Sequence, residues 1–412
     1  MCDAHIYNYI QPLLISKPCK IQVYTMLKKA LLVIAFTMLF QWAYALKILS
    51  GPYIQNVTET SCDILWRTDK PSTAWVELAP DDGTHFYYKE RPRTYATDLG
   101  RALVGTMHRV TLKGLKPGTA YRYRVFSREV VDQQPYHVVY GDKAATDVFR
   151  GVPPRFTTLS PGKDTLEFLV LNDIHGQNDL LEDLLGNVGK DSTDFILYNG
   201  DMVNFMDNED GLFTGFINTS VKHFASEKPF VMARGNHESR GALAKDYMRY
   251  FPTPTGKPYY SFRRGPCFFI MLDAGEDKPD SDIEYSGTCF SDDYRKAQVQ
   301  WLEETLQSDE CREAPFRVVV MHIPLNNAEW HGQVHARECF LPLLNNAGID
   351  LMLCAHMHCY AYYPKGNEGI GFPVLQNSND ESVRIKVDKN ALDMQVFNRK
   401  GEALHKFRFD AK

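Results

Sequence analysis

Residues 194–204 have the sequence Asp194-Phe195-Ile196-Leu197-Tyr198-Asn199-Gly200-Asp201-Met202-Val203-Asn204. The apolar run at the start of this segment predicts a short buried strand, and the Asn-Gly-Asp that follows ends it. In α/β proteins the residues that carry out chemistry gather at the carboxyl ends of strands. The segment therefore predicts an interior strand with a candidate functional aspartate, Asp201, directly after it.

The same arrangement occurs at four other places in the second half of the chain. Strands are predicted at residues 166–171, 228–233, 316–321 and 349–354, and each is followed by Asp, Asn or His. A helical period over residues 292–306 separates two of them, so the region predicts an α/β sheet. The polar segments are, in chain order, Asn172-Asp173-Ile174-His175, Arg234-Gly235-Asn236-His237-Glu238, His322 and Ala355-His356-Met357-His358.

These side chains are of the types that bind first-row transition metals through oxygen and nitrogen. Asp173 and His175 are two residues apart, and so are His356 and His358. On an extended chain both members of such a pair point the same way, so that one metal can take both. A single His after a strand is ordinary, but five such segments in this order predict a metal centre.

The five segments resemble the motifs of the calcineurin-like metallophosphoesterase superfamily: D-x-H, G-D-x-x-[DN], G-N-H-[DE], H and G-H-x-H. The resemblance covers residues 165–380. It implies two divalent or trivalent metal ions (Mn, Fe or Zn) and attack on a phosphate ester by a metal-bound hydroxide. By the resemblance, one metal is held by Asp173, His175, Asp201 and His358, and the other by Asp201, Asn236, His322 and His356, with Asp201 as the bridge.

The resemblance also implies roles for residues that do not bind metal. His237 would contact the phosphoryl group and protonate the leaving oxygen. His331, nine residues after His322, matches a substrate-facing His of plant-type acid phosphatases, and a solvated loop histidine is the alternative. Glu238 would contribute to the electrostatics or to the loop structure. Arg234 would hold phosphate or form a structural salt bridge.

Three positions depart from the pattern of purple acid phosphatases, whose architecture the chain resembles. Asn204 stands where those enzymes have a Tyr three residues after the bridging Asp. The segment Asp173-Ile174-His175 stands in place of their Asp-x-Gly, and Ala355 replaces the Gly of the last motif. The first two departures predict a site without an iron–tyrosinate bond.

The region before residue 160 predicts short strands and no chemistry of its own. Alternating runs at 61–68 and 73–78 predict two strands. The segment Leu115-Lys116-Pro117-Gly118-Thr119-Ala120-Tyr121 resembles the E–F corner of fibronectin type III domains, where a Tyr hydroxyl hydrogen-bonds the upstream backbone. Trp66 matches the core Trp of that fold. The resemblance implies a β sandwich.

The predicted fold is thus an N-terminal all-β sandwich followed by an α/β metallophosphoesterase domain with two packed β-sheets flanked by helices. The sandwich is expected at residues 46–159, as a fibronectin type III-like or purple acid phosphatase N-terminal-like domain, and the catalytic domain at 160–412. Residues 372–377, 382–387, 392–398 and 403–409 are predicted to be antiparallel strands that complete the second sheet.

Residues 26–45 predict a secretory signal peptide. Met26-Leu27-Lys28-Lys29 is a short cationic start, an apolar run follows, and Ala43-Tyr44-Ala45 is a small-x-small cleavage site. A membrane anchor is the alternative, but the apolar run is shorter than the roughly 20 residues that span a bilayer. Residues 1–25 are interpreted as an extension upstream of the true start. The predicted location is secreted or periplasmic, without a stable membrane span.

Composition limits the classes of function. The chain has 412 residues, of which 44% are hydrophobic and 24% charged, so a disordered or multi-span membrane protein is excluded. The net charge of −5 provides no field for nucleic acid. Nine cysteines are too few for a disulfide scaffold. Seven of them follow Ala45, so at least one thiol in the mature chain is unpaired or pairs with another chain.

The predicted function is a secreted dinuclear metallophosphoesterase that hydrolyses small phosphate monoesters. A phosphodiesterase or nucleotide-processing hydrolase at the same site is one alternative, with residues 276–291 shaping the space for a second ester arm. A surface glycan- or protein-binding module is the alternative of another class, with Trp75 and Tyr87 or Tyr88 as a carbohydrate platform. The natural substrate, the metals and the oligomeric state stay open.

Overall fold

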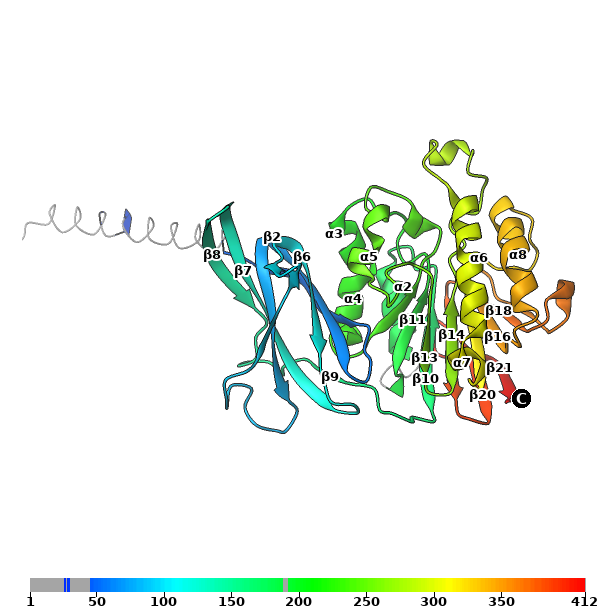
Figure 1. Ribbon diagram of the computed structural model, residues 1–412, viewed down its shortest axis with the longest axis horizontal. Helices are drawn as coiled ribbons and strands as arrows, with labels where there is room; N and C mark the ends of the chain where they lie inside the picture. Colours follow the sequence, from blue (N-terminus) through cyan, green and yellow to red (C-terminus); the bar gives the residue numbers. More distant parts are fainter. Residues whose placement is uncertain (1–25, 27, 30–44, 188–191, 412) are drawn as a thin grey trace, which may run out of the picture.

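The computed structural model describes residues 26, 28, 29, 45–187 and 192–411. An all-β part lies at one end of the molecule and an α/β part makes up the rest (Figure 1). Residues 1–25 and most of the predicted signal peptide lie outside the described residues. Within the described ranges, no helix has the length and apolar character needed to cross a membrane. All seven described cysteines are free thiols.

The all-β part is built around one long strand, β2 (Ser61–Pro80). Its first half pairs with β1 (Ile48–Gln55) and β6 (Gly105–Lys113), and its second half pairs with β7 (Ala120–Gln134). The remaining strands are β3 (Arg93–Tyr95), β4 (Thr97–Asp98), β5 (Arg101–Ala102), β8 (His137–Ala145) and β9 (Arg155–Thr157). The two strands predicted at 61–68 and 73–78 are therefore one, because the backbone stays extended while it changes partners.

Two predicted features of this part are confirmed. Trp66 is fully buried, and its Nε1 donates to the Ser127 hydroxyl at 2.9 Å. The Tyr121 hydroxyl accepts a hydrogen bond from the Lys116 backbone N–H at 2.9 Å. This contact is the predicted tyrosine corner, which pins the turn to the strand that follows it.

The predicted carbohydrate platform is wrong. The Trp75 ring is buried and stacks on Phe126 with centroids 4.9 Å apart. The Arg93 guanidinium lies 5.9 Å from the centre of the same ring. Since Trp75 is covered by these neighbours, it has no open face on which a sugar could stack.

Two six-stranded sheets pack face to face in the α/β part, as predicted (Figure 1). Their orders are β12-β11-β10-β19-β20-β21 and β13-β14-β15-β16-β18-β17. The strands are β10 (Leu166–Leu171), β11 (Phe195–Asn199), β12 (Phe230–Ala233), β13 (Tyr260–Arg264), β14 (Cys267–Met271), β15 (Phe316–Val320), β16 (Leu351–Cys354), β17 (Ala361–Tyr363), β18 (Val374–Gln376), β19 (Glu381–Val387), β20 (Ala391–Asn398) and β21 (Ala403–Asp410). Inward-facing side chains such as Phe168 and Leu353 share one apolar cluster between the sheets.

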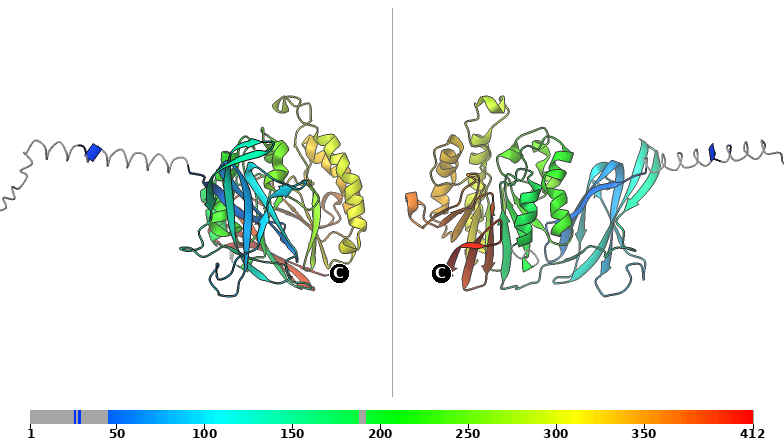
Figure 2. Two further views of the ribbon diagram at one scale, coloured as in Figure 1. Left: turned by 60° about the vertical axis from the view of Figure 1, so that its left-hand side comes forward. Right: turned by 180° about the vertical axis from the view of Figure 1, so that it is seen from behind.

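Helices cover the outer faces of both sheets, and the other views show the same layers (Figure 2). The first sheet is covered by α2 (Asn178–Asn187) and the helical segments from α3 (Glu209–Leu212) to η3 (Val221–Ala225). The second is covered by α6 (Ser291–Gln307) and α8 (His331–Leu344). Shorter helices are α4 (Asn218–Ser220), α5 (Tyr247–Tyr250) and α7 (Asp309–Arg312). The layers bury the apolar face of every sheet, which fixes the strand ends relative to one another.

The prediction for the C-terminal strands is wrong in its pairing. β18 pairs in parallel with β16, and β19 to β21 extend the first sheet from β10 instead of completing the second. Alternation of apolar and polar residues predicts a strand but does not indicate the strand with which it pairs. β13 and β14, which form one edge of the second sheet, were not predicted.

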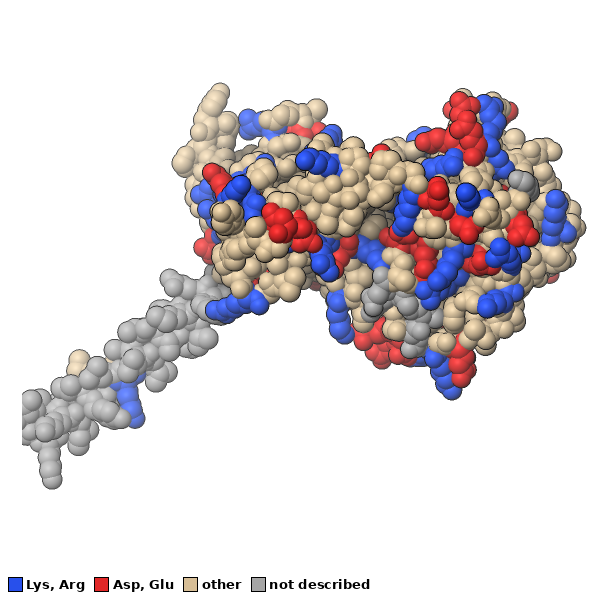
Figure 3. Space-filling view, turned by 90° about the horizontal axis from the view of Figure 1, so that it is seen from below, with Lys and Arg blue, Asp and Glu red and all other residues tan. Residues whose placement is uncertain are grey.

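The two parts share a packed interface. The Tyr53 hydroxyl donates to the Tyr250 carbonyl at 2.9 Å, and the Tyr123 hydroxyl donates to the Ser226 carbonyl at 2.6 Å. The Tyr53 ring also stacks on Phe230 with centroids 5.8 Å apart. The all-β part therefore buttresses the helical layer of the first sheet, while every predicted metal ligand comes from the α/β part. On the face shown in Figure 3, basic and acidic side chains are interspersed over the α/β part.

Candidate metal centre

The five polar segments meet at one edge of the packed sheets. They follow β10, β11 and β12 in the first sheet and β15 and β16 in the second. β13 and β14 lie between β12 and β15 in the chain, so the five strands are not consecutive in sequence. Neighbouring strands within each group run parallel, so their carboxyl ends lie on the same side. The predicted ligands from both sheets are thereby brought together.

Side chains from both sheets approach to within contact distance. Asp201 Oδ2 lies 3.0 Å from His322 Nε2, and Asp173 Oδ1 lies 3.2 Å from His358 Nε2. His175 Nε2 and His358 Nε2 are 3.1 Å apart. The groups whose ligand atoms all lie within 4.8 Å of one another are Asp173, His175 and His358; His175, Asp201 and His237; and Asp201, His322 and His356. Asp201 belongs to two groups, which is the position expected of a bridging ligand.

One of the converging oxygens has a lone pair that the protein itself leaves unsatisfied. Asp173 Oδ1 is buried and accepts no hydrogen bond. The side-chain amide of Asn236 lies against His356 Nδ1 at 3.1 Å and Asp201 Oδ2 at 3.3 Å, which places it among the other predicted ligands. Carboxylate, amide and imidazole donors of this kind suit Mn, Fe and Zn, so the residues present fit a pair of such ions.

Without metal, the site stabilises positive charge in the form of a proton. Burial opposes a charge on His322, but Asp201 and Asp173 outweigh it and raise the pKa of His322 to about 10. Burial also opposes the charge on Asp201, yet His322 holds the pKa of this carboxyl well below its usual range. Burial and the charge on His322 lower the pKa of His356 to about 4. A metal that binds here must release the His322 proton.

The backbone at the predicted ligands is unusual. Asp173, His175, Asp201, His356 and His358 have φ values of +51°, +50°, +55°, +72° and +52°. They are half of the ten non-glycine residues with positive φ in the described part of the chain. Residues other than glycine rarely adopt this conformation, and it concentrates at functional sites. Here it turns each side chain toward the centre directly after its strand.

Polar groups on the far side of two of the rings orient the histidines. His322 Nδ1 donates to the Asn199 carbonyl at 2.7 Å, which leaves Nε2 facing the site. Asp277 Oδ2 lies 3.7 Å from His356 Nε2, on the opposite edge of the ring from Asn236. A carboxylate behind a ligating imidazole fixes the ring and raises its basicity.

Asp277 was missed by the sequence analysis because β14 was not predicted. The run Cys267-Phe268-Phe269-Ile270-Met271-Leu272, followed by Asp273, has the same pattern as the five predicted strands. This run of residues is the pattern from which β14, and the loop after it that carries Asp277, could have been predicted.

Glu238 acts on the structure of the loops. Its buried carboxylate accepts hydrogen bonds from the backbone N–H groups of Asp201 at 2.9 Å, Met202 at 2.7 Å and Gly235 at 3.0 Å. Burial, together with the charge of Asp201, raises the pKa of Glu238 to about 7. One carboxylate thus ties the loop after β11 to the loop after β12.

Two glycines allow these loops to approach closely. A Cβ at Gly235 would overlap the Asp201 carboxylate, and a Cβ at Gly200 would overlap the His322 ring. Gly200 also has a φ of +83°, which favours glycine. The Gly-Asp and Gly-Asn pairs of the sequence are therefore steric requirements of the centre.

His237 lies beside the predicted ligands. Its Nδ1 is 2.8 Å from the Asn204 carbonyl, which can only accept, so Nδ1 carries a hydrogen. Its Nε2 lies 3.9 Å from Asp201 Oδ2. The Phe205 ring, half exposed, lies 6.0 Å from the His237 ring. The Nε2 of His237 is thus the ring atom that faces the centre.

His331 and Arg234 have partners of their own. His331, at the start of α8, places Nε2 2.9 Å from Asp292 Oδ1 on α6 and stacks on His335. It is in none of the ligand groups formed by the described residues. Arg234 pairs with Asp273 at 2.6 Å, which is the structural salt bridge of the two predicted roles.

Comparison with known families supports this arrangement. Residues 166–360 match the family model described as calcineurin-like phosphoesterase. The chain carries a calcineurin-like phosphoesterase domain. All seven predicted metal ligands lie within the phosphoesterase domain. Residues 52–140, in the all-β part, match the model described as purple acid phosphatase, N-terminal domain. The fibronectin type III resemblance stays a prediction.

Two curated relatives of this chain are named as acid phosphatases. Purple acid phosphatase 21 of Arabidopsis thaliana is 26% identical over 270 residues, which cover 62% of this chain and 53% of that protein. Acid phosphatase type 7 of Mus musculus is 25% identical over 275 residues, which cover 62% of this chain and 56% of that protein. The chain thus spans about half the length of these relatives.

Solved structures share the fold. A purple acid phosphatase from yellow lupin (Lupinus luteus) seeds has a TM-score of 0.63 at 14% identity, over 89% of this chain and 74% of that one. The structure of PhoD has a TM-score of 0.56 at 14% identity, over 89% of this chain and 92% of that one. At this identity the likeness concerns the fold, and it extends across both parts of the chain.

Proposed function

We propose that this chain hydrolyses phosphate monoesters with a pair of metal ions. The observation that carries the proposal is the convergence of lone-pair donors around Asp201, with the buried Asp173 Oδ1 accepting no hydrogen bond. The names of the curated relatives, which are phosphatases, support the same class of reaction.

In this proposal the seven ligands divide into two sets. The sets are Asp173, His175, Asp201 and His358 for one ion, and Asp201, Asn236, His322 and His356 for the other. Two cations held there lower the pKa of water and draw negative charge from the phosphoryl oxygens.

The chain supplies the proton chemistry through His237. The Asn204 carbonyl keeps one hydrogen on Nδ1. Proton transfer to or from the site is therefore confined to Nε2. When the ring is doubly protonated, we assign Nε2–H as the donor to the leaving oxygen. A positioned acid of this kind contributes about 10²–10⁴ in rate when the leaving group is a poor one.

His331 is proposed in a lesser role. Its Nε2 is occupied by Asp292, on which it depends for its orientation. If His331 touches the substrate, it does so through ring atoms other than Nε2. We therefore expect His331 to contribute to binding and not to proton transfer.

Export is proposed on the sequence of residues 26–45 alone. Cleavage after Ala45 would leave Leu46 as the first residue of the mature protein. N-terminal sequencing of protein recovered outside the cytoplasm of an expressing cell tests this. A chain that is recovered with its leader intact would contradict it.

The proposed activity is tested with an aryl phosphate. The protein, purified without chelator, is assayed with and without added Mn²⁺, and again after dialysis against chelator. The proposal expects turnover that chelator abolishes and metal restores. Full turnover by metal-free protein, or no turnover of mono- or diesters with any of Mn, Fe and Zn, would overturn it.

A further inference from the structure

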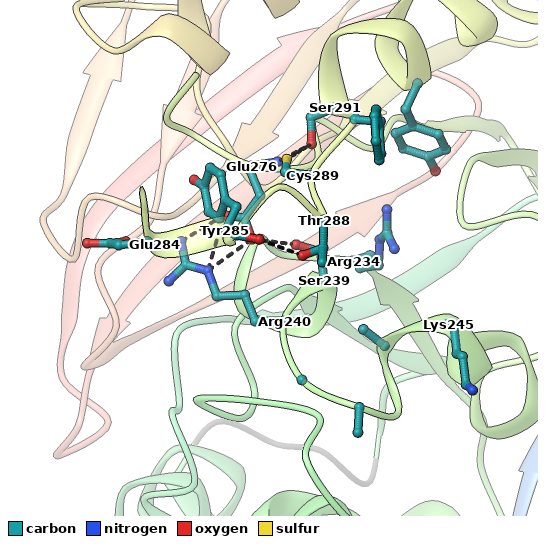
Figure 4. Close-up of a pocket in the computed structure, with 15 residues that line it drawn as sticks. Arg234, Ser239, Arg240, Lys245, Glu276, Glu284, Tyr285, Thr288, Cys289 and Ser291 are labelled. Carbon is teal, nitrogen blue, oxygen red and sulfur yellow. Dashed lines mark hydrogen bonds and ion pairs between the residues drawn. The ribbon is translucent and has the colours of Figure 1, made fainter. Parts of the chain in front are cut away.

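A cavity of about 480 Å³ lies between the loop after β12 and the loop that precedes α6 (Figure 4). The first loop contributes Arg240, Ala242 and Lys245, and the second contributes Tyr285 and Phe290. None of its lining residues is a predicted metal ligand. Its volume falls within the roughly 300–1,000 Å³ of small-molecule sites.

The cavity adjoins the candidate metal centre through Arg240. This side chain lines the cavity, and its Nη2 lies 3.1 Å from the side-chain amide of the predicted ligand Asn236. Arg234 and Ser239, which flank the Asn236 loop, line the cavity as well. An organic group attached to a phosphoryl group at the centre therefore has this space within its reach.

Most charges in the cavity are already neutralised. Arg240 pairs with Glu276 at 2.7 Å, in the middle of the view in Figure 4. Arg234 pairs with Asp273 at 2.6 Å, and Glu284 pairs with Lys278 at 2.5 Å. Lys245 is exposed, and no carboxylate among residues 45–187 and 192–411 pairs with it. The cavity is left with one uncompensated positive charge.

Part of the cavity wall is aromatic. Tyr285, Phe290 and Tyr294 all line the cavity. The Tyr285 hydroxyl donates to Asp277 at 3.1 Å and the Tyr294 hydroxyl donates to Asp273 at 2.9 Å. Arg240 lies 5.9 Å from the centre of the Tyr285 ring and Arg234 lies 5.3 Å from that of Tyr294, so both tyrosine rings already have a partner. The Phe290 ring, which is exposed, is the aromatic surface open to a ligand. Aromatic rings prefer a flat partner that can stack offset or edge to face.

We propose that this cavity binds the organic arm of the phosphoester and favours an aromatic arm that carries a negative charge. The ring of the arm packs against Phe290, and its anionic group pairs with Lys245. The inference rests on the proposed phosphoesterase function and adds the class of substrate to it.

The test compares two aryl esters with similar leaving groups, phenyl phosphate and 4-carboxyphenyl phosphate, by kcat/KM. The metal-loaded wild-type protein is expected to prefer the carboxylated ester. Lys245→Gln is expected to lower the preference about 5-fold, the effect of one exposed ion pair. Lys257→Gln, at an exposed lysine that does not line the cavity, is the matched control and is expected to keep the wild-type preference.

A second variant tests the cavity itself. Ala242→Trp places a ring in the space and is expected to raise KM for both aryl esters more than KM for a small alkyl phosphate. Equal kcat/KM for the two aryl esters in the wild type, unchanged by Lys245→Gln, would overturn the inference while the measured turnover upholds the phosphoesterase function. Absence of turnover of all three esters, with metal bound, would overturn the function itself.

Discussion

The carboxylate of Glu238 accepts a hydrogen bond from the backbone N–H of Asp201 at 2.9 Å. Asp201, the predicted bridging ligand, is thus held at its backbone N–H by Glu238, a residue of the loop after the neighbouring strand β12. Glu238 also accepts from Gly235 at 3.0 Å, so it joins the loops that carry Asp201 and Asn236. The geometry of the centre depends on a buried acid that contacts no substrate.

We predict that Glu238→Gln destabilises the protein and weakens metal retention. The glutamine amide would turn a donor toward backbone N–H groups that now meet an oxygen. An unsatisfied buried donor costs about 1–3 kcal/mol, so the free energy of unfolding should fall by about 2 kcal/mol. Urea denaturation and metal content after gel filtration measure the two effects. Glu303→Gln, at an exposed position of α6, is the control, and equal stability of both variants would contradict the prediction.

A second prediction concerns colour. Asn204 lies 3.0 Å from His175 Nδ1 through its side-chain oxygen and cannot supply a phenolate. Tyr198, the nearest alternative in sequence, donates to or accepts from the Ser220 hydroxyl at 2.7 Å, and its burial raises its pKa. Iron-loaded protein should therefore lack a strong visible charge-transfer band. A purple preparation would show that another tyrosine reaches the metal.

A third prediction separates the two candidate catalytic histidines. An alkyl ester needs a proton on its leaving oxygen, whereas nitrophenolate leaves unaided. Loss of a general acid should therefore lower kcat/KM for an alkyl phosphate about 10²-fold or more beyond its effect on nitrophenyl phosphate. We expect this unequal loss for His237→Ala and a smaller, equal loss for His331→Ala. The reverse pattern would move the acid to His331, and a viscosity control shows whether chemistry limits the rate.

A fourth prediction concerns acid stability and the all-β part. Burial, with the charge of Arg249, lowers the pKa of His108 from 6.5 to about 4. Between these two pH values the unfolded chain binds the proton and the folded chain does not, so stability is lost as pH falls from 6.5 toward 4. The loss from this one group is about 3 kcal/mol.

His108 accepts or donates at Nε2 with Thr68 and Ser72, at 2.9 and 3.0 Å, contacts that a glutamine amide can partly replace. His108→Gln should therefore be less stable at pH 7 but lose less stability on going to pH 4.5. Urea denaturation of both proteins at the two pH values in the same metal-free buffer gives the comparison. Parallel losses in the two proteins would contradict the assignment.

The strands that bear the centre could be predicted because each combines two independent signals. An apolar run fixes a buried strand, and the Asp, Asn or His directly after it marks the carboxyl end. Trp66 and Tyr121 were predicted from the resemblance of the segments around them to fibronectin type III domains. These signals are local, so a single sequence contains them.

The features of the fold and the site that were not predicted depend on residues that are distant in the chain. The parallel pairing of β18 with β16 and the attachment of β19 to β10 are set by which edges remain open once the sheets assemble. The loop that carries Asp277 has a local signal, but the contact of Asp277 with His356 was not predictable because it joins loops from two different strands. The positive φ values of the ligands could not be predicted either, because Asp and His adopt negative φ at most positions and nothing in the sequence distinguishes these ones.

The most direct test of the central claim is the number of metal ions bound per chain, measured by elemental analysis in parallel with turnover of an aryl phosphate. Wild-type protein purified without chelator should hold two ions and turn over substrate. Asp201→Asn keeps the size of the side chain but removes the charge that the two ions share, so it should lose at least one ion and nearly all activity. Turnover at the wild-type rate by a protein that holds no metal would contradict the account.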